Sequence, residues 1–430
     1  MYIYVFIFLL LQGSRLCASD GQPANLTFFD IAKLAKQADL KTPARFFDVE
    51  SNQAERRADN LLQNPSFSYQ VGQANSGGYV GRTHEVAVAQ TLPVLGAGVG
   101  LITGKSITSY HAQSKANDAR FGAEKTQTQQ LARDHVAETL LEAMQLCILQ
   151  ELAKHSEERQ VRYQLLEKYL RHNVAPSPAA RVDNLLIENQ MLSAQKELLF
   201  IELQKQKLQS HIKFKLYIDG SGSLNIDPLW FDRGVALDQK RFRERVRASN
   251  SSLSVLRALL EAAYSETEAA ELKRFPEFTL SAGYRFEDMA PSNTFVYGAM
   301  SAVIPLWNGG GHLVQSKRLH AESLKSALVA EEKQVDLQLQ DLFYEYQYAA
   351  KLLETFSRTR VTDLEQRAEF AEKAFRTGRL SATQFLAIDT QIHTTLNSVF
   401  DAQLQYFKTI LDLLNILAEE FGVHYRDSLL

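Results

Sequence analysis

The chain has 430 residues and carries 47 lysines and arginines against 50 aspartates and glutamates, which gives a formal net charge of −3 at pH 7. This balance offers no basic surface for nucleic acid, so we expect no nucleic-acid partner. The 10 prolines and 21 glycines gather at a few points, and the long stretches between them predict a mainly helical protein.

The first residues resemble a secretory signal peptide. An apolar run at residues 2–12 precedes the small residues Ala18 and Ser19, although no lysine or arginine comes before the run. This pattern predicts that residues 1–19 are removed on export. A buried N-terminal strand or helix is the alternative. Lipidation at Cys17 is less favoured, because the residues before it do not form a lipobox.

No later stretch reaches the ~18 consecutive apolar residues of a membrane-spanning helix. The only other cysteine is Cys147, so we expect no intrachain disulfide after cleavage of the signal.

A β-hairpin is predicted at about residues 65–92, after a polar helical segment at 26–62. Apolar Phe67, Tyr69 and Val71 alternate with small or polar residues, and a glycine-rich turn leads to a second alternating run. Two residues then mark a predicted joint between strand and helix, Pro93 and Gly96.

Two long helices follow, predicted within about residues 97–216. They are separated by a break at 173–178, and the segment 217–249 reads as an irregular connection. A helix as long as the first of them is typical of a coiled coil or of a helical barrel.

The second half repeats this order, with a helix at about 252–273 and a hairpin at about 276–306. Its predicted joint between strand and helix contains Pro305, Gly309 and Gly310. The pair of long helices at about 309–421 consists of one helix from 312 to 375, a turn at 377–381 and a last helix.

The two halves form an internal repeat. Pro276 follows Pro65 by 211 residues (276 − 65), and Pro305 follows Pro93 by 212 (305 − 93). The predicted organisation is a signal peptide (1–19), a first repeat (20–216), an irregular equatorial connection (217–249), a second repeat (250–422) and a C-terminal tail (423–430).

The strands of the two predicted hairpins have about the length and the alternation of a transmembrane β-barrel, in which apolar groups face outward and polar groups face water. A soluble hairpin would give the same alternation. Four strands cannot close a barrel, and lipid does not tolerate unpaired edges, so a membrane barrel requires several chains. Three chains would supply twelve strands.

No catalytic, cofactor-binding or metal-binding constellation is present, so we expect neither an enzyme nor a cofactor. The chain has no P-loop, no dinucleotide-binding glycine pattern and no HExxH. The glycines after Pro93 resemble a phosphate loop, but a simple strand-to-helix turn is the better reading. His312 and His320 lie too far apart along a helix to favour a metal site.

Taken in order, these motifs resemble the TolC-like outer-membrane efflux proteins, and among them the heavy-metal CzcC-type branch. The resemblance rests on Asn64-Pro65, on the Gln90–Pro93 exit, on Ile304–Asn308, and on Gly378–Ser381 before an Ala/Leu/Gln-rich helix. It covers about residues 30–422.

The resemblance implies a mainly α fold with a small antiparallel β part. Long helical hairpins would form a periplasmic tunnel, and four strands per chain would join a homotrimeric twelve-stranded barrel in outer-membrane lipid. It also implies two partners, a periplasmic adaptor and an inner-membrane pump that we expect to be proton-driven. The helix turns expected to meet the adaptor are Asn173, Val174, Ala175 and Pro176, and Gly378, Arg379, Leu380 and Ser381.

Many relatives carry an aspartate about six residues after the turn glycine, where it forms an acidic ring at the tunnel constriction. Gln384 occupies that place here, and Arg181 is the nearest match in the first repeat, so strong cation selectivity is not expected. Asp183 and Asp389 lie further along, and we take these four residues as candidates for the constriction.

The predicted function is a passive exit duct for small molecules or metal ions, driven by a partner pump. The outer-membrane component of a type I protein secretion system is the alternative within the family. A periplasmic coiled-coil scaffold without a pore is a further alternative, although the short 217–249 connection leaves no room for the modules that adaptors carry.

Overall fold

A computed structural model describes residues 24–39, 41–59, 64–76, 79–92, 108–173, 178–218, 222–275, 278–288, 292–302, 309–357, 359–422 and 425. The chain divides into two compact units. The strand unit comprises Ala44–Thr128 and Ser251–Gln334, and the helical unit comprises Met1–Pro43, Gln129–Asn250 and Val335–Leu430. Both units therefore draw on both predicted repeats, and each is described here by itself.

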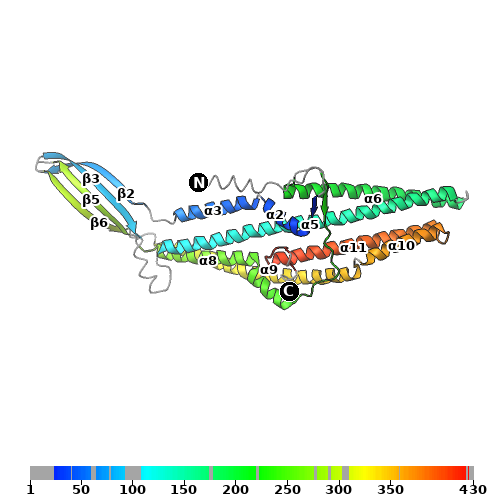
Figure 1. The fold of residues 1–430 in the computed structure, drawn as a ribbon. Helices are drawn as coiled ribbons and strands as arrows, with labels where there is room; N and C mark the ends of the chain where they lie inside the picture. Colours follow the sequence, from blue (N-terminus) through cyan, green and yellow to red (C-terminus); the bar gives the residue numbers. More distant parts are fainter. Residues whose placement is uncertain are drawn as a thin grey trace. The chain divides into compact units, whose positions relative to one another are not determined.

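The strand unit contains one four-stranded antiparallel sheet in the order β2-β3-β5-β6 (Figure 1). Its strands are β2 (Ser66–Ser76), β3 (Tyr79–Leu92), β5 (Phe278–Asp288) and β6 (Asn293–Ala302). Both predicted hairpins are present. They join through β3 and β5, where Val86 pairs with Tyr284.

Helices complete the strand unit, and one buried carboxylate ties three of them together. They are most of α3 (Lys41–Asp59), the beginning of α5 (Ser109–Asn173), α8 (Ser251–Leu272) and the beginning of α9 (Gly311–Thr355). Glu266 on α8 is buried and forms ion pairs with Arg120 on α5 and, at 2.7 Å, with Lys317 on α9. Without these two cations the buried Glu266 would be an uncompensated charge, so the three helices depend on one another for stability.

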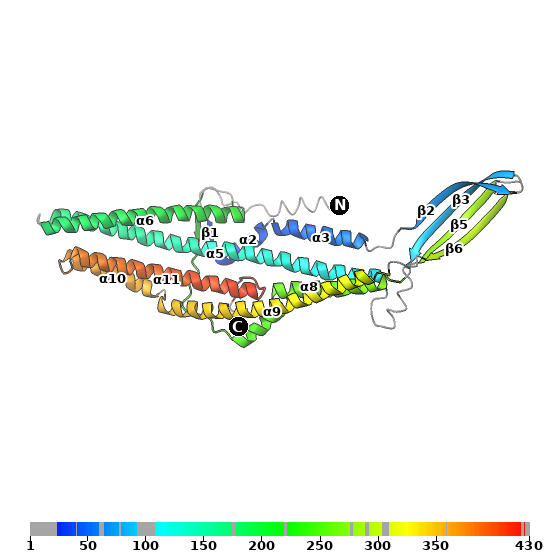
Figure 2. The ribbon, with the colours of Figure 1, turned by 180° about the vertical axis from the view of Figure 1, so that it is seen from behind.

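The helical unit is built on the remaining lengths of α5 and α9, with α5 beside α6 and α10 beside α11 in both views (Figures 1 and 2). The long helices are completed by α6 (Pro178–Leu216), α10 (Thr359–Arg376) and α11 (Ala382–Ile416). The smaller elements are β1 (Ala24–Leu26), α2 (Phe28–Ala38), β4 (Leu224–Ile226) and α7 (Gln239–Ser249).

Aromatic side chains form the core where α2 and the 217–249 segment meet α11. Phe231 packs edge-on against Tyr406, with ring centroids 5.1 Å apart, and Phe28 packs edge-on against Phe407 at 5.4 Å. The buried Gln403 side chain also accepts a hydrogen bond from the Phe231 N–H at 2.9 Å and donates one to its carbonyl at 2.8 Å. A connecting segment is thereby held without leaving its buried backbone groups unpaired.

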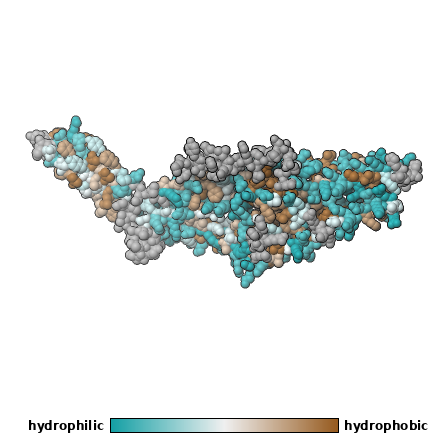
Figure 3. Space-filling model, in the orientation of Figure 1, coloured by the Kyte–Doolittle hydropathy of each residue, from teal (hydrophilic) through white to brown (hydrophobic). Residues whose placement is uncertain are grey.

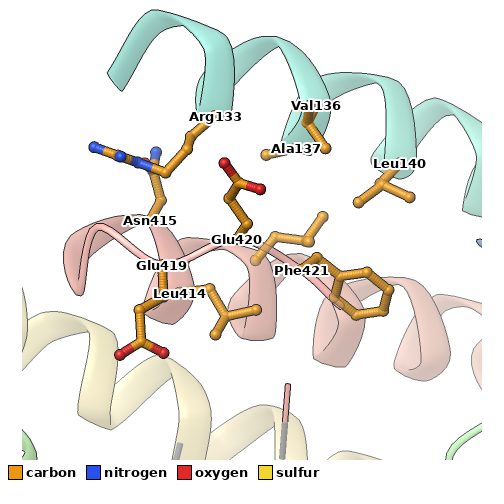
Figure 4. A pocket seen from close by; sticks show the side chains of 10 residues that line it. Arg133, Val136, Ala137, Leu140, Leu414, Asn415, Glu419, Glu420 and Phe421 are labelled. Atoms are coloured by element: carbon orange, nitrogen blue, oxygen red, sulfur yellow. The ribbon is translucent and has the colours of Figure 1, made fainter. Parts of the chain in front are cut away.

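A small cavity lies between α5, α11 and the segment that follows α11 (Figure 4). Leu140 on α5 and Leu414 on α11 line it, together with Phe421. Its volume of about 20 Å³ is enough for roughly one water molecule. We therefore treat it as a packing defect and not as a ligand site.

The structure corrects two predictions of local structure. The 217–249 segment is not wholly irregular, because it contains β4 and α7. β4 pairs with the distant β1, a contact that local sequence does not reveal, and α7 begins where the Asp238 side chain caps the N–H groups of Lys240 and Arg241. The single helix predicted from 312 to 375 is two helices, since α9 ends at Thr355 and α10 begins at Thr359.

Candidate functional site

One face of the sheet is apolar and exposed to solvent. Residues paired across the strands point to the same face, so Tyr69, Val86, Tyr284 and Val296 form one row across all four strands. Val296 is 83 % exposed and Tyr284 is 48 % exposed. The exposed apolar residues of this face are Phe67, Tyr69, Val71, Val80, Val88, Leu280, Tyr284, Val296 and Met300. Figure 3 shows apolar residues interspersed with polar ones on the visible surface of the sheet.

The opposite face is mostly polar and is less exposed along β5. Thr279, Ser281, Gly283, Arg285 and Glu287 lie on it, and each is half-buried while their apolar neighbours at 280, 282 and 284 are exposed. A soluble sheet covers its apolar face and exposes its polar face. Along β5 the arrangement is the reverse, whereas β2 and most of β6 are exposed on both faces.

Side-chain contacts order the polar face. The Tyr297 hydroxyl donates to the Glu85 carboxylate, and Arg285 Nε lies 3.2 Å from Glu287 Oε1. Tyr297 reaches Glu85 by lying over Gly283, where an added Cβ would be 2.4 Å from the ring. Gly283 therefore has a steric reason to lack a side chain.

Both edges of this sheet are open in the part of the chain that the structure describes, since β2 pairs only with β3 and β6 only with β5. Open edges with exposed backbone donors and acceptors are sites at which another strand can pair.

The predicted joints between strand and helix are only partly described. Pro93, Gly96 and Pro305 lie outside the described residues. Gly310 has φ +68°, a conformation that favours glycine, and Arg274 Nε donates to the Gly309 carbonyl at 2.9 Å. These contacts fix the point at which α9 begins, while its function as a joint stays a prediction.

The turn between α10 and α11 is closed by backbone geometry and a cap. Gly378 has φ +72°, and the Arg379 N–H donates to the Ala374 carbonyl at 2.9 Å, as in a glycine-terminated helix. Ser381 then starts α11 by a reciprocal capping box with Gln384. Leu380 packs against the neighbouring core, which leaves Arg379 as the exposed charge of the turn.

The corresponding turn of the first hairpin is largely outside the described residues, which end at Asn173 and resume at Pro178. Val174, Ala175 and Pro176 therefore cannot be placed. The two hairpins nevertheless meet near their turns, because the Tyr169 hydroxyl donates to the Arg376 carbonyl at 2.7 Å.

A compact core lies beneath these turns and joins all four helices. Tyr163 on α5 packs edge-on against Phe385 on α11, and Phe385 also lies 5.4 Å from Phe375 on α10. The buried members of this core are Tyr163, Leu166, Leu170, Ile187, Ala194, Ala371, Phe375, Ala382, Phe385 and Leu386. The α10–α11 turn therefore adjoins a packed core shared by all four helices.

A buried ionic cluster adjoins this core. The Asp389 side chain is 3 % exposed and accepts from Arg159 Nε at 2.6 Å, from Arg162 at 3.1 Å and from the Tyr163 hydroxyl. Burial raises the pKa of Tyr163, and the Asp389 carboxylate raises it further, so the phenol stays protonated and donates. Burial alone would lower the pKa of Arg159, but the effect of Asp389 prevails and holds it above the ordinary value.

The cluster extends to α6 through Glu197. Arg159 lies 3.4 Å from Glu197, and His393 Nε2 on α11 lies 2.7 Å from the same carboxylate. The hydrogen bond with His393 is the main cause that keeps the pKa of Glu197 below its ordinary value. Three helices are thus joined through paired charges.

The four residues proposed for the constriction have different environments. Arg181 is exposed and Asp183 is half-buried on α6, and neither has a hydrogen bond or ion pair in the described chain. Gln384 is exposed and serves as a cap, whereas Asp389 is buried and neutralised by two arginines. These positions are not brought into contact with one another within one chain.

Sequence reasoning missed Arg159, Arg162 and Tyr163. Their spacing places all three on one side of a helix, and Asp389 interrupts an apolar run. A charged residue on the buried face of a helix requires a partner of opposite charge. The sequence therefore indicated that Asp389 has a partner, although it did not show which residue that is.

The described residues include no cluster of at least three histidine, cysteine, aspartate or glutamate side chains that could hold a metal ion. Among the helices that the structure describes, none is both long and apolar enough to cross a membrane.

Solved structures share this fold at low sequence identity. The chain is similar to the channel-forming protein CusC, with a TM-score of 0.69, 14 % identity and coverage of 93 % of this chain and 95 % of that one. For the outer-membrane channel OprN the TM-score is 0.66 at 14 % identity, and the match covers 91 % of this chain and 89 % of that one. For the Neisseria gonorrhoeae outer-membrane channel MtrE the TM-score is 0.64 at 14 % identity, and the match covers 92 % of this chain and 89 % of that one.

No protein-family model matches the chain, and no curated protein matches it. The fold is that of the TolC-like outer-membrane channels, as the sequence motifs predicted, and these relatives in structure are channels and not enzymes. The shared fold does not distinguish the CzcC-type branch from the other TolC-like channels.

Proposed function

We propose that this chain is the outer-membrane channel of an efflux system, a passive duct formed by three copies. The observation that carries the proposal is the reversed polarity along β5, where apolar Tyr284 is exposed and polar Ser281 and Arg285 are half-buried, beside the exposed Val296 of β6. Lipid on the apolar side and water on the polar side would satisfy both faces. The fold shared with known outer-membrane channels supports the same conclusion.

The open edges of the sheet support the oligomer. An unpaired edge is not tolerated in lipid, so β2 and β6 require strands from other copies. Three copies of the four strands would give the twelve-stranded barrel that the resemblance implies.

An exposed apolar stripe on α6 supports the same oligomer. Leu185, Leu192 and Leu199 recur every seven residues and are 58 %, 55 % and 66 % exposed. Leucines at this spacing form the seam between two packed helices. We infer that a helix of a neighbouring copy covers them.

The finer assignments rest on the resemblance and on the order of the elements. Each hairpin is followed by long helices, which supports an internal two-fold repeat. The turns at 173–176 and 378–381 would meet a periplasmic adaptor and, through it, an inner-membrane pump. Residues 1–19 would direct export to the outer membrane. Small molecules are the proposed cargo, a heavy-metal cargo rests on the branch resemblance alone, and protein secretion is the alternative.

Cysteine labelling tests the membrane placement. In a Cys147→Ala background, single cysteines replace Ser281 on the polar face or Tyr284 on the apolar face. In isolated outer membranes, a charged, water-soluble maleimide should label Ser281→Cys and leave Tyr284→Cys largely unreacted, while both should react after denaturation. Equal labelling of the two positions, or recovery of the protein in the soluble periplasm, would reject the membrane barrel.

A further inference from the structure

A pocket in the helical unit that is open to solvent has the size of a small-molecule site, and its charged residues Lys154, Asp232 and Glu365 are exposed. Its volume is about 370 Å³, which lies within the range of ligand pockets, roughly 300–1,000 Å³. It is bounded by α5, by the segment after β4, by the first turns of α10 and by α11. The lining residues are Glu151, Lys154, His155, Trp230, Asp232, Val361, Thr362, Glu365 and Phe400.

Aromatic rings form one wall of this cavity, which we call the Trp230 pocket. The Trp230 and Phe400 ring centroids lie 5.8 Å apart, and the His155 ring lies 6.3 Å from Phe400. Phe400 is buried and Trp230 is half-buried, so the wall is held in place by packing. Aromatic faces attract cations through their quadrupoles.

Carboxylates predominate among the charged groups of the pocket. Glu151, Asp232 and Glu365 oppose the single cation Lys154. Glu151 and Asp232 have no ion-pair partner among the residues that the structure describes, and Glu365 lies 3.7 Å from His155 Nδ1. The carboxylate and ammonium groups that line the pocket therefore carry a net negative charge.

We propose that the Trp230 pocket binds a small organic ammonium ion. The aromatic wall receives the alkylated, weakly hydrated side of the cation, and the carboxylates balance its charge. A metal ion would lack enough ligands, since the described residues contain no metal-binding cluster. A neutral or anionic ligand would leave the negative charge of the pocket uncompensated.

Two features of the pocket act against a cation and set the direction of the tests. Lys154 contributes a positive charge. Val361 and Thr362 belong to the first turn of α10, where the helix dipole is positive. Since three carboxylates outweigh these contributions, neutralising Lys154 should strengthen binding and neutralising a carboxylate should weaken it.

Tryptophan fluorescence of the full chain tests the proposal. The chain has two tryptophans, so Trp307→Phe leaves Trp230 as the only reporter. Sodium chloride is replaced stepwise by choline chloride at constant ionic strength, which removes general salt effects. A saturable change in Trp230 emission is expected, and the neutral isostere 3,3-dimethylbutan-1-ol should produce none.

Charge variants give the decisive comparison. Asp232→Asn and Glu365→Gln should each weaken choline binding by about 1.5- to 5-fold, and Lys154→Gln should strengthen it by a similar factor. Glu369→Gln, which removes an exposed carboxylate on α10 outside the pocket, is the matched control and should change nothing.

A response that does not saturate, an equal response to the neutral alcohol, or variants that fail to move affinity in these opposite directions would overturn the proposal. Absence of any response in the assembled protein would overturn it as well. The measurement requires no transport, so a protein that binds choline but forms no channel would contradict only the proposed function.

Discussion

Arg159 on α5 and Asp389 on α11 are 230 residues apart in the chain and meet in the interior of the helical unit, with Nε 2.6 Å from Oδ2. The Asp389 side chain is 3 % exposed and that of Arg159 is 11 % exposed. Water therefore screens this pair poorly. Each charge depends on the other for its solvation, so the pair fixes the two helices in register below the α10–α11 turn.

Asp389→Asn should strongly destabilise the helical unit. The substitution removes the nearest counter-charge of Arg159 and Arg162 and leaves them only the longer ion pairs with Glu197 at 3.4 Å and Glu372 at 3.7 Å. Breaking a buried pair of this kind costs about 3–5 kcal/mol. We expect a clear drop in the thermal unfolding midpoint, measured by circular dichroism in detergent. Asp363→Asn, at an exposed position on α10 without an ion pair in the described chain, should leave the midpoint unchanged. Equal midpoints for the two variants would show that Asp389 is dispensable.

Glu197 should make the stability of the helical unit dependent on pH in the acidic range. Its pKa in the folded state is lowered chiefly by His393, so its ordinary value of 4.5 applies only when the chain is unfolded. A lowered carboxylate pKa contributes stability that is complete above the unfolded value and is lost as pH falls through the folded value. The wild-type protein should therefore lose this contribution below about pH 4.5.

His393→Gln tests that assignment. At neutral pH the variant should unfold at a lower temperature than the wild type, because the hydrogen bond to Glu197 is weakened. The difference should shrink only below about pH 4.5, where Glu197 becomes protonated in both proteins. A difference in unfolding temperature that stays constant from neutral to acidic pH would assign the effect of His393 to packing.

The sequence predicted the elements that local patterns specify. Strand alternation located both hairpins, and the scarcity of breakers located the long helices. The pairing of β1 with β4 escaped prediction because Leu224 meets Ala24 across 200 residues (224 − 24). The break between α9 and α10 also escaped, because no glycine or proline lies between Thr355 and Thr359.

The candidate sites were predictable to different degrees. Gly378 and Ser381 follow known rules for helix ends, so the turn was readable from sequence. The partners of Asp389 were not, because a single sequence contains no information on which helix faces it. The Trp230 pocket combines residues from four separate segments and has no local signature.

Two adjacent glycines at the start of α9 should respond differently to alanine. Gly310 has φ +68°, and its added Cβ would lie 3.1 Å from Arg274 Cγ, whereas a Cβ at Gly309 meets nothing within 4 Å. We expect Gly310→Ala to destabilise the protein by about 1–2 kcal/mol and Gly309→Ala to have little effect. Denaturant unfolding of both variants measures this. Similar losses at both positions would indicate that the positive φ is not required.

The sheet offers a second pair of matched glycines. A Cβ at Gly283 would lie 2.4 Å from the Tyr297 ring, while one at Gly298 would lie 3.9 Å from the Ser281 carbonyl. Gly283→Ala should displace Tyr297 from Glu85 and lower the yield of assembled protein in outer membranes, and Gly298→Ala should not. Tyr297→Ala combined with Gly283→Ala should restore part of the yield, because the clash is removed. If the double variant assembles no better than Gly283→Ala, the ring contact is not the cause.

Gln384 provides a test of the proposed constriction. It is exposed at the start of α11, close to the Gly378 turn. Its side chain accepts a hydrogen bond from the Ser381 N–H, and the carboxylate of an aspartate at this position could accept the same bond. If three copies of Gln384 surround the narrow end of a duct, Gln384→Asp places three carboxylates there and should raise cation over anion selectivity in planar bilayers. Gln391→Asp, seven residues further along the same exposed helix face, introduces the same charge away from the turn and should change selectivity less. An equal change in selectivity for both variants would show that the constriction is not at the turn. No change in selectivity for either variant would show that α11 does not line the duct.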